Sequence, residues 1–450
     1  MVKKVVIVGA GPSGVLLAHY LLRRGDQYQI DIYDRLSDPR VLEFSNARTY
    51  PISLTERGMK ALNQIPGVEA AVRAVSLEMS GTIFHQQNGK TRVTSGKKSL
   101  VTLDPSSKKP LVTLDRTKLV ITLLEKLTEQ YDPKRLKLHF NQSCTEVDFA
   151  AKTITFQLTA QSAESTDANL TVNYDLLIGA DGARSAVRSA FLNTELFELE
   201  QKYVPIDYKS ILIPRSDQPS DTYLESDKIH SWRNNDAITV LLLHQLDGSI
   251  SGVIHFPRWN TQVTDLTTPE AVLKFFHKHF PEVGQLMPPS EAEAFLKRPP
   301  SHTLTIRCNR YHYGDSVLIL GDAAHAVSPS LGQGCNAALE DVTIVNDLLN
   351  EYVDDWAGAI AQFTVRRKAD AHALVELGDH SLPSSPKLFL EFGLREQLAK
   401  TLHRLFPAHF APSLLELVSE SSVPYSEILH SYKGWITKVK KSNQQFLQVS

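Results

Sequence analysis

The chain has 450 residues, of which 42% are hydrophobic and 22% are charged, and its formal net charge at pH 7 is −2. This composition is typical of a globular protein with two or more lobes, and the small net charge gives no reason to expect nucleic acid or an anionic membrane as a partner. We find no run of about twenty apolar residues, so no membrane span is predicted. The cysteines Cys144, Cys308 and Cys335 lack metal-ligand spacing, so we expect no metal site and a cytoplasmic location.

Residues 1–37 predict a dinucleotide-binding βαβ unit. A short apolar, β-branched strand meets the motif Gly9-x-Gly11-x-x-Gly14, and an apolar helix follows. Gly9 allows the tight turn, Gly11 lets the backbone approach a pyrophosphate at the helix N-terminus, and Gly14 lets helix and strand pack closely. A second strand ends at Asp34, about twenty residues after the last glycine, where an acid can accept hydrogen bonds from a ribose. An ordinary glycine turn in an α/β sheet is the alternative.

Further elements are predicted from apolar periodicity along the rest of the chain. We expect helices at 54–74, 116–131, 269–280, 290–297 and 334–352, strands at 78–104, 136–140, 152–158, 203–215, 237–256 and 317–320, a hairpin tip at 160–169 and a helical tail at 383–450.

A second segment, Asp175–Arg188, predicts a buried strand that ends in Gly-Ala-Asp-Gly, with a helix beginning at about Ser185. Asp181 stands at the carboxyl end of this strand, where open α/β sheets bind ligands. From spacing alone, a helix-capping Asp in a strand-to-helix turn is the better interpretation.

A third segment, Gly321–Asp341, again brings an acid, Asp322, to the end of a buried strand. The run Gly332–Asn336 then opens a long helix, whose free N–H groups and positive dipole end suit the electron-rich edge of a reduced flavin. His325 lies close to Asp322, and we interpret it as structural rather than as an acid–base group.

In this order, the three segments resemble the flavin-dependent aromatic hydroxylases with a single FAD-binding domain. Asp181-Gly182 is similar to their DG motif and Gly321-Asp322 to their GD motif. The segments Gly332–Ala337, Arg48–Gly58 and Leu402–Glu427 resemble the kynurenine 3-monooxygenase family, so that the resemblance spans nearly the whole chain.

The resemblance implies an FAD-dependent monooxygenase that uses NADPH or NADH as a transient reductant and hydroxylates a small aromatic or indole-like substrate with O₂. The flavin C4a-hydroperoxide would carry the chemistry, and no side chain needs to act as a nucleophile. Only one GxGxxG motif is present, which favours transient nicotinamide docking over a second Rossmann domain.

The implied fold class is α/β, with a Rossmann-like FAD-binding domain of the GR2, para-hydroxybenzoate hydroxylase-like type, an inserted mixed β-sheet substrate domain and a helical C-terminal region. The implied boundaries are 1–77, 105–200 and 300–380 for the FAD-binding domain, 78–104 and 201–299 for the substrate domain, and 381–450 for the C-terminal region. We expect a monomer or a homodimer.

The resemblance also implies the cofactor contacts. Those near the pyrophosphate are Gly9, Gly11, Ser13 and Gly14; those on the adenosine side are Asp34, Arg35 and the backbone of Cys144; the remaining FAD contacts are Arg48, Ser53, Arg116, Asp181 and Asp322, with Gly334, Cys335 and Asn336 at the isoalloxazine.

The expected substrate pocket departs from the family. Thr82 stands where the family has an arginine that binds the substrate carboxylate, and the stretches Thr94–Lys97 and His380–Leu382 lack the expected tyrosines. The pocket would include Thr82, Pro329, Ser330, Leu331 and Gly332. A buried carboxylate without a cation is costly, so we expect a substrate other than L-kynurenine unless Arg215 or Arg233 supplies the charge.

Two other functions are alternatives to a monooxygenase. They are an FAD-dependent reductase of the geranylgeranyl-reductase type and a non-catalytic FAD-binding protein.

Overall fold

The computed structural model describes residues 2–41, 50–86, 89–95, 111–159, 169–215, 222–383 and 385–449. Its central sheet is mostly parallel and has the strand order β18-β19-β12-β1-β2-β8. These strands are β1 (Lys3–Val8), β2 (Tyr28–Tyr33), β8 (Leu136–His139), β12 (Leu176–Gly179), β18 (His312–Tyr313) and β19 (Val317–Ile319). The predicted buried strands at the N-terminus and at 317–320 are therefore confirmed, within two residues at their ends.

Helices and a small sheet pack on the central sheet. The helices are α1 (Pro12–Arg23), α4 (Arg116–Gln130), α5 (Ala186–Phe191) and α10 (Gly334–Glu351), and the small sheet contains β9 (Gln142–Asp148), β10 (Thr153–Leu158) and β11 (Leu170–Asn173). Phe156 of β10 stacks on Tyr33 of β2, with 4.0 Å between the ring centroids. Most of the predicted hairpin tip lies outside the described residues, but the strands on either side of it, β10 and β11, pair antiparallel.

The β1–α1 connection has its conformation because of its glycines. Gly9 has a φ of 107°, and a Cβ there would lie 2.3 Å from the carbonyl oxygen of Ala180, in the loop after β12. A Cβ on Gly14 would lie 2.2 Å from the oxygen of Gly9. The predicted turn and the predicted close packing of helix on strand are both confirmed.

A third sheet, with the order β3-β7-β4, lies beside α2 (Glu56–Asn63) and α3 (Val68–Ala74). Its strands are β3 (Pro51–Leu54), β4 (Leu77–Met79) and β7 (Leu111–Asp115). The single helix predicted for 54–74 is two helices, because Pro66 and Gly67 interrupt it and Gly67 has a φ of 80°.

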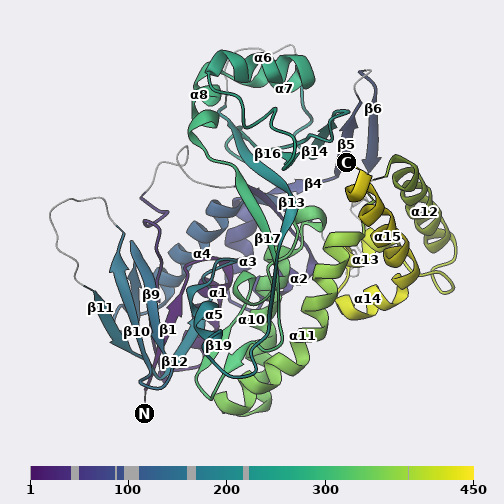
Figure 1. The fold of residues 1–450 in the computed structure, drawn as a ribbon. Coiled ribbons are helices and arrows are strands. Elements are labelled where there is room, and N and C mark those ends of the chain that lie inside the picture. The colour runs from purple at the N-terminus through teal and green to yellow at the C-terminus, as the bar shows by residue number, and fades with distance from the viewer. Residues whose placement is uncertain are drawn as a thin grey trace.

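A seven-stranded mixed sheet forms the upper part of the molecule in Figure 1, in the order β17-β13-β16-β15-β14-β5-β6. Its strands are β5 (Gly81–His85), β6 (Thr91–Ser95), β13 (Leu199–Ile213), β14 (Lys228–Arg233), β15 (Thr239–His244), β16 (Ile250–Pro257) and β17 (Ser301–Cys308). The stretch predicted as one strand, 237–256, is the hairpin β15–β16. Its turn contains Gly248 with a φ of 84°.

Three helices, α6 (Pro269–His279), α7 (Pro281–Leu286) and α8 (Pro289–Lys297), cover one face of this sheet (Figure 1). Val240, Ile254 and Phe256 share a second apolar core with Phe276 and Phe295 of these helices. Strand side chains alternate between the two faces of a sheet, so the neighbours Val253 and His255 point to the other face. The predicted domain boundaries remain a prediction; the sheet itself also includes residues 301–308 of β17.

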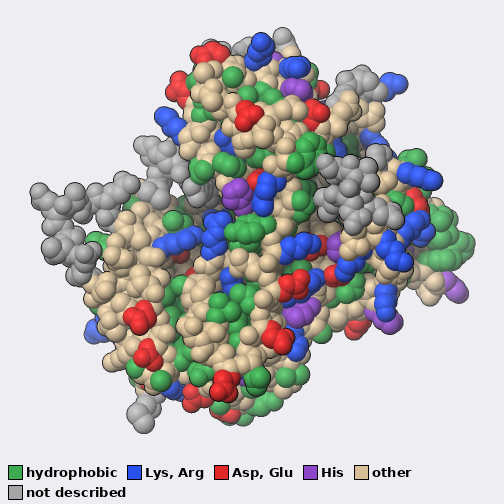
Figure 2. Space-filling model, in the orientation of Figure 1, with side chains coloured by type: hydrophobic (Ala, Val, Ile, Leu, Met, Phe, Trp, Pro, Cys, Tyr) green, Lys and Arg blue, Asp and Glu red, His purple; other side chains and the backbone are tan. Residues whose placement is uncertain are grey.

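The C-terminal region is helical, as predicted, and packs beside α11 (Trp356–His380) at the right of Figure 1. It contains α12 (Pro386–Leu405), α13 (Leu414–Glu420), α14 (Tyr425–Ser431) and α15 (Lys433–Val449). Exposed apolar side chains of α12, including Leu390, Leu394 and Leu398, gather at the right edge of the surface in Figure 2. In the described part of the chain, no helix combines the length and apolar character that crossing a bilayer requires.

Candidate functional site

The three sequence segments meet at one edge of the central sheet. Strands β19, β12, β1 and β2 are neighbours and run parallel, so their carboxyl ends lie along the same edge. Asp322, Asp181, the glycine motif and Asp34 follow these four strands in turn. This edge is where open α/β sheets bind ligands.

The glycine turn leaves room for a phosphate group. Gly11 is the N-cap of α1 and has no side-chain cap, and a Cβ built on it would have no atom within 4 Å among the described residues. Ser13 is buried in the first turn, and a Cβ on Gly321 would lie 3.0 Å from its Oγ. An uncapped helix N-terminus next to open space suits a pyrophosphate.

Asp34 is held by the backbone next to this turn. Its two carboxylate oxygens accept hydrogen bonds from the N–H groups of Ala10 and Leu36, at 2.7 and 2.8 Å. Arg35 is exposed, and its carbonyl oxygen accepts a bond from the Thr159 hydroxyl at 2.8 Å. Cys144 lies in β9; burial and the nearby Asp181 raise the pKa of its thiol to about 12.

Asp181 caps a helix, as the alternative interpretation had it. One of its oxygens accepts bonds from the N–H groups of Ala186 and Val187 at the start of α5, at 2.7 and 3.3 Å. Its other oxygen, Oδ1, is buried and has no partner among the described residues. Burial raises the pKa of this carboxyl group, so an added donor at Oδ1 would stabilise the anion.

Asp322 faces a space inside the protein. Its side chain is open to solvent, yet burial raises its pKa, against the opposing effects of His325 and Arg116. Exposure together with desolvation indicates a carboxylate that lines an internal hollow rather than the outer surface. Tyr50, Arg116 and Cys335 have the same combination of partial exposure and dense surroundings.

Tyr50 links this hollow to the seven-stranded sheet. The guanidinium of Arg116 lies 5.6 Å from the centre of the Tyr50 ring, and the Tyr208 ring of β13 lies 5.9 Å from it in an edge-to-face geometry. Our sequence predictions missed both tyrosines as site residues. Tyr50 stands within a quoted family segment, but no local pattern indicates that Tyr208 would face it.

The long helix α10 begins as predicted, after Gly332 with a φ of 64°, and Gln333 gives it no side-chain cap. Gly334 and Cys335 form its first turn, close to Asp322: a Cβ on Gly334 would lie 4.0 Å from the Asp322 Oδ1. The Asn336 side chain is buried and bonds to β3, donating to the Ser53 carbonyl at 2.9 Å. The predicted residues Ser53 and Asn336 are therefore direct neighbours.

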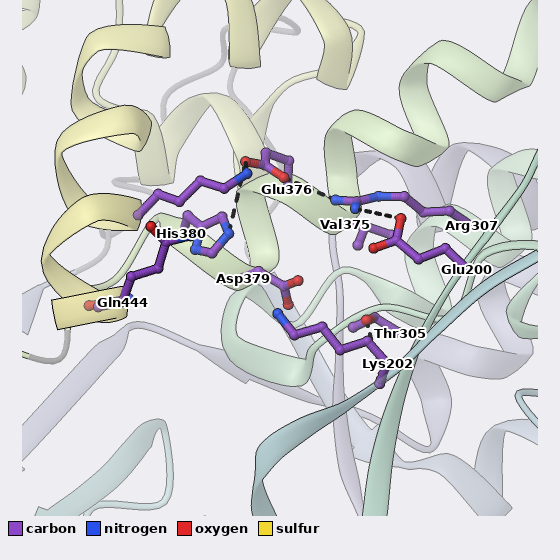
Figure 3. Close-up of a pocket in the computed structure, with 11 residues that line it drawn as sticks. Glu200, Lys202, Thr305, Arg307, Val375, Glu376, Asp379, His380 and Gln444 are labelled. Carbon is purple, nitrogen blue, oxygen red and sulfur yellow. Dashed lines mark hydrogen bonds and ion pairs between the residues drawn. The ribbon is translucent and has the colours of Figure 1, made fainter. Parts of the chain in front are cut away.

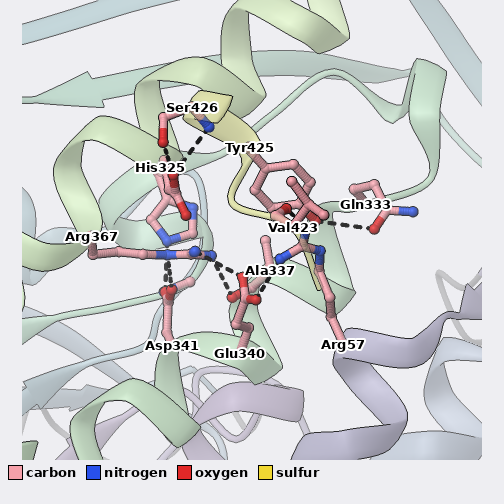
Figure 4. A network of polar contacts seen from close by, with 12 residues as sticks. Arg57, His325, Gln333, Ala337, Glu340, Asp341, Arg367, Val423, Tyr425 and Ser426 are labelled. Carbon is pink, nitrogen blue, oxygen red and sulfur yellow. Dashed lines mark hydrogen bonds and ion pairs between the residues drawn. The ribbon is translucent and has the colours of Figure 1, made fainter. Parts of the chain in front are cut away.

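His325 belongs to a buried ionic network (Figure 4), in agreement with its structural interpretation. Asp341 accepts hydrogen bonds from the Gly321 N–H at 2.7 Å, from His325 Nε2 at 2.6 Å and from Arg367 Nε at 2.7 Å. Because Gly321 precedes Asp322, this network fixes the turn that presents the Asp322 carboxylate.

The same network ties the C-terminal helices to the start of α10. Glu340 bonds to Arg367 and to Arg57 of α2, and Arg57 also contacts the carbonyl of Val423. The Arg57 guanidinium lies 4.1 Å from the ring centre of Tyr425, whose hydroxyl donates to Gln333 Oε1 at 3.1 Å. Figure 4 shows these side chains converging from α2, α10, α11 and α14.

The predicted pocket residues lie in two places. Thr82 is on β5, and the strand alternation puts it on the face opposite Ile83, away from α6–α8. Pro329, Ser330 and Leu331 form the 3₁₀ turn η2 (Pro329–Leu331) before Gly332, and the Ser330 hydroxyl donates to the Gly378 carbonyl at 2.5 Å. Arg233 pairs with Thr239 of β15 and so lies on the same face of the sheet, but it is exposed and its guanidinium lies 6.0 Å from the ring centre of Phe389 of α12. Arg48 lies outside the described residues.

A separate cavity of about 250 Å³ lies between β13, β17, α11 and α15 (Figure 3). Its lining is charged, and the charges pair with one another: Glu376 contacts Arg307 at 3.0 Å and Lys440 at 2.7 Å. None of the predicted FAD or pocket residues lines it. Because it lacks the apolar walls that an aromatic ring needs, we do not place the aromatic substrate there.

The groups at the sheet edge fit FAD. The open space at Gly11 and the uncapped N-terminus of α1 match a pyrophosphate, the uncapped N-terminus of α10 matches a flavin edge, and the accessible Asp322 matches a polyol chain.

Solved structures of other proteins share this fold. The tetrameric form of 2-methyl-3-hydroxypyridine-5-carboxylic acid oxygenase has a TM-score of 0.66 at 17% identity, covering 84% of this chain and 91% of its own. A variant of Klebsiella pneumoniae HpxO complexed with FAD has a TM-score of 0.63 at 18% identity, covering 97% and 99%. The fold is that of the FAD-dependent aromatic hydroxylases, the class A flavoprotein monooxygenases.

The sequence comparisons narrow this class. The family model described as FAD binding domain matches residues 3–377. Kynurenine 3-monooxygenase of Drosophila willistoni is 32% identical over 96% of this chain and 90% of its own length, and that of Salinispora tropica is 30% identical over 95% and 90%. The chain belongs to the kynurenine 3-monooxygenase family of FAD-dependent monooxygenases. The predicted fold class, cofactor and enzyme type are confirmed, and family membership favours a monooxygenase over the reductase and non-catalytic alternatives.

Proposed function

We propose that this enzyme hydroxylates an aromatic compound that resembles kynurenine in its ring but lacks the α-amino acid head group. The observation that carries the proposal is the identity of residue 82. Thr82 stands on the face of β5 away from α6–α8, where the family resemblance calls for a carboxylate-binding arginine. A carboxylate that enters an enclosed pocket loses its hydration and needs a cation in return.

We also propose that the predicted cofactor residues hold FAD in this site. The backbone around Gly11 and Ser13 would receive the pyrophosphate, and Asp34 would accept bonds from the ribose. Asp322 would bond to the ribityl chain. The N-terminus of α10, at Gly334 and Cys335, would stabilise negative charge on the flavin.

When bound, FAD supplies electron transfer from NADPH or NADH and the activation of O₂. The chain's own contribution is positioning. The Asp341 network fixes the turn at Gly321 and Asp322, and the Asn336 side chain fixes β3 against the start of α10. The seven-stranded sheet and the η2 turn would enclose the aromatic ring and exclude water.

The decisive experiment compares L-kynurenine with 2-aminoacetophenone, which shares its aminophenyl ketone but has no amino acid head group. We expect 2-aminoacetophenone to stimulate NAD(P)H oxidation with oxygen uptake and to give a product sixteen mass units heavier. A kcat/KM for L-kynurenine on the order of 10⁴ M⁻¹s⁻¹ or above would contradict the proposal.

A gain-of-function variant makes the same test sharper. Thr82→Arg should create the missing cation and raise activity on L-kynurenine at least tenfold. Phe84→Arg is the matched control, because Phe84 lies two residues further along the same face of β5 and is more exposed. Equal effects of both substitutions would show that general positive charge, rather than this position, is responsible.

The oligomeric state, predicted as monomer or homodimer, and the cytoplasmic location remain predictions. Size-exclusion chromatography with light scattering and fractionation of the native cells would test them.

A further inference from the structure

His255 lies on the face of the seven-stranded sheet that is turned toward the predicted FAD-binding residues. Its register partners are Tyr208 on β13 and Thr239 on β15. Residues paired across neighbouring strands share a face, and Tyr208 contacts Tyr50 beside Arg116. Four residues earlier on the same face of β16, the Ser251 hydroxyl lies 3.5 Å from a carboxylate oxygen of Asp115, the residue before Arg116.

This histidine differs from the others on the sheet. His85 and His230 bond to each other at 3.0 Å, His244 bonds to the Leu224 carbonyl at 3.1 Å, and His302 pairs with Asp207 at 2.9 Å. His255 alone among the sheet's described histidines has no hydrogen-bond partner in the described residues. Its ring neighbour is Tyr208, with 5.9 Å between the centroids.

The environment keeps the His255 imidazole neutral. Burial lowers its pKa to about 4, although the side chain keeps partial exposure. As for Asp322, this combination indicates a group that lines an internal space. A neutral imidazole offers one N–H donor and one nitrogen acceptor, and both can hydrogen-bond a ligand that enters this space.

The surrounding face limits what could occupy this space. Leu241 and Val253 are neighbours of His255 in the sheet and give an apolar wall for an aromatic ring. A neutral imidazole complements a neutral hydroxyl or amine on such a ring better than a carboxylate, because the imidazole carries no balancing charge.

We propose that His255 hydrogen-bonds a hydroxyl or amine substituent on the substrate's aromatic ring and thereby selects neutral phenols and aromatic amines. This inference rests on the proposed function and identifies the substituent that the site recognises. His255 is a specificity-determining residue in this assignment. It forms and breaks no covalent bond.

Equilibrium dialysis of the FAD-loaded protein tests the assignment without turnover. The probes are 2-aminoacetophenone and 2-(dimethylamino)acetophenone, which has lost its N–H donors. We expect the native protein to prefer the primary amine by about tenfold, the size of one net hydrogen bond. His255→Phe should abolish this preference, and His255→Gln should keep part of it.

Because the methyl groups also add bulk, the diagnostic quantity is the change in preference on substitution. The matched control is His244→Phe, the same replacement on the opposite face of the sheet, which should leave the preference at the native value. FAD content and melting temperature of each variant verify that the site is intact.

The outcomes separate the two proposals. An unchanged preference in His255→Phe, or no preference in the native protein, overturns the role of His255. A His255-dependent preference without any NAD(P)H oxidation overturns the proposed hydroxylation but leaves the binding role in place. If the native protein binds neither compound, both proposals fail.

Discussion

The buried side chain of Asn336 fastens β3 to the start of α10. Its Nδ2 donates to the Ser53 carbonyl at 2.9 Å, and its Oδ1 accepts from the Thr55 N–H at 2.8 Å. Helix α2 packs closely against this amide, because a Cβ on Gly58 would lie 2.5 Å from the same Oδ1. One amide thus joins two segments that are both predicted to contact FAD.

Asn336→Ala should destabilise the protein and weaken FAD binding together. It leaves the buried Thr55 N–H without its acceptor, a loss of roughly 1–3 kcal/mol for each unsatisfied group. Thermal unfolding and FAD titration measure both effects. Asn350→Ala removes only an exposed hydrogen bond from Arg24 near the end of the same helix and should stay close to the native protein. Equal behaviour of the two variants would contradict a structural role for the Asn336 amide.

Gly11→Ala should lower FAD affinity at least tenfold without lowering the stability of the apoprotein. Among the described residues, the added Cβ meets no atom within 4 Å, and Gly11 has an ordinary extended backbone, so we expect the collision to be with a bound ligand. Gly393→Ala, at another open position in α12, serves as the control. Native FAD affinity in Gly11→Ala would mean that the pyrophosphate does not pass this turn.

Arg367→Leu should cost about 3–5 kcal/mol of stability, because it leaves the buried Asp341 carboxylate without its guanidinium partner. Denaturant unfolding measures the loss. The neighbouring Arg366→Leu removes only an exposed ion pair with Glu351 and should leave the unfolding midpoint close to the native one. A midpoint for Arg367→Leu as high as for Arg366→Leu would rule out a structural role for the network.

Stability should fall as the pH drops from about 6.5 toward 4, in part through His19. Burial lowers the pKa of this fully buried imidazole to about 4 although it bonds to the Leu123 carbonyl. Within this window the unfolded chain binds a proton that the native protein does not, so protonation favours unfolding, by up to about 3 kcal/mol at the acid end.

Melting temperatures between pH 7 and pH 4.5 test this expectation. His19→Gln should lose less stability on acidification than the native protein, whereas His409→Gln, at an exposed position, should follow the native curve. If the melting temperatures of His19→Gln and the native protein fall equally on acidification, His19 does not contribute to the loss of stability.

The sequence predicted the strands, the glycine turn and the helix starts at the carboxyl edge of the central sheet well because the signals there are local. Gly9 is needed for a positive φ and Gly14 for close helix packing, and both requirements act within one strand–turn–helix unit. Asp181 illustrates the limit of such signals: its spacing fitted both a ligand contact and a helix cap, and the structure shows the cap with one oxygen left over.

By itself, the sequence determined the α/β fold, the flavin cofactor and the order of the motifs, since short apolar strands, glycine turns and helix starts are set by neighbouring residues. Only the tertiary structure decided which side chains share the internal space. His255, Tyr208 and Tyr50 are far apart in the chain, and they meet because strand register fixes which face each one occupies. Register depends on pairing between distant segments and on which face is buried, so no local pattern around His255 could have predicted that it would lie beside Tyr208.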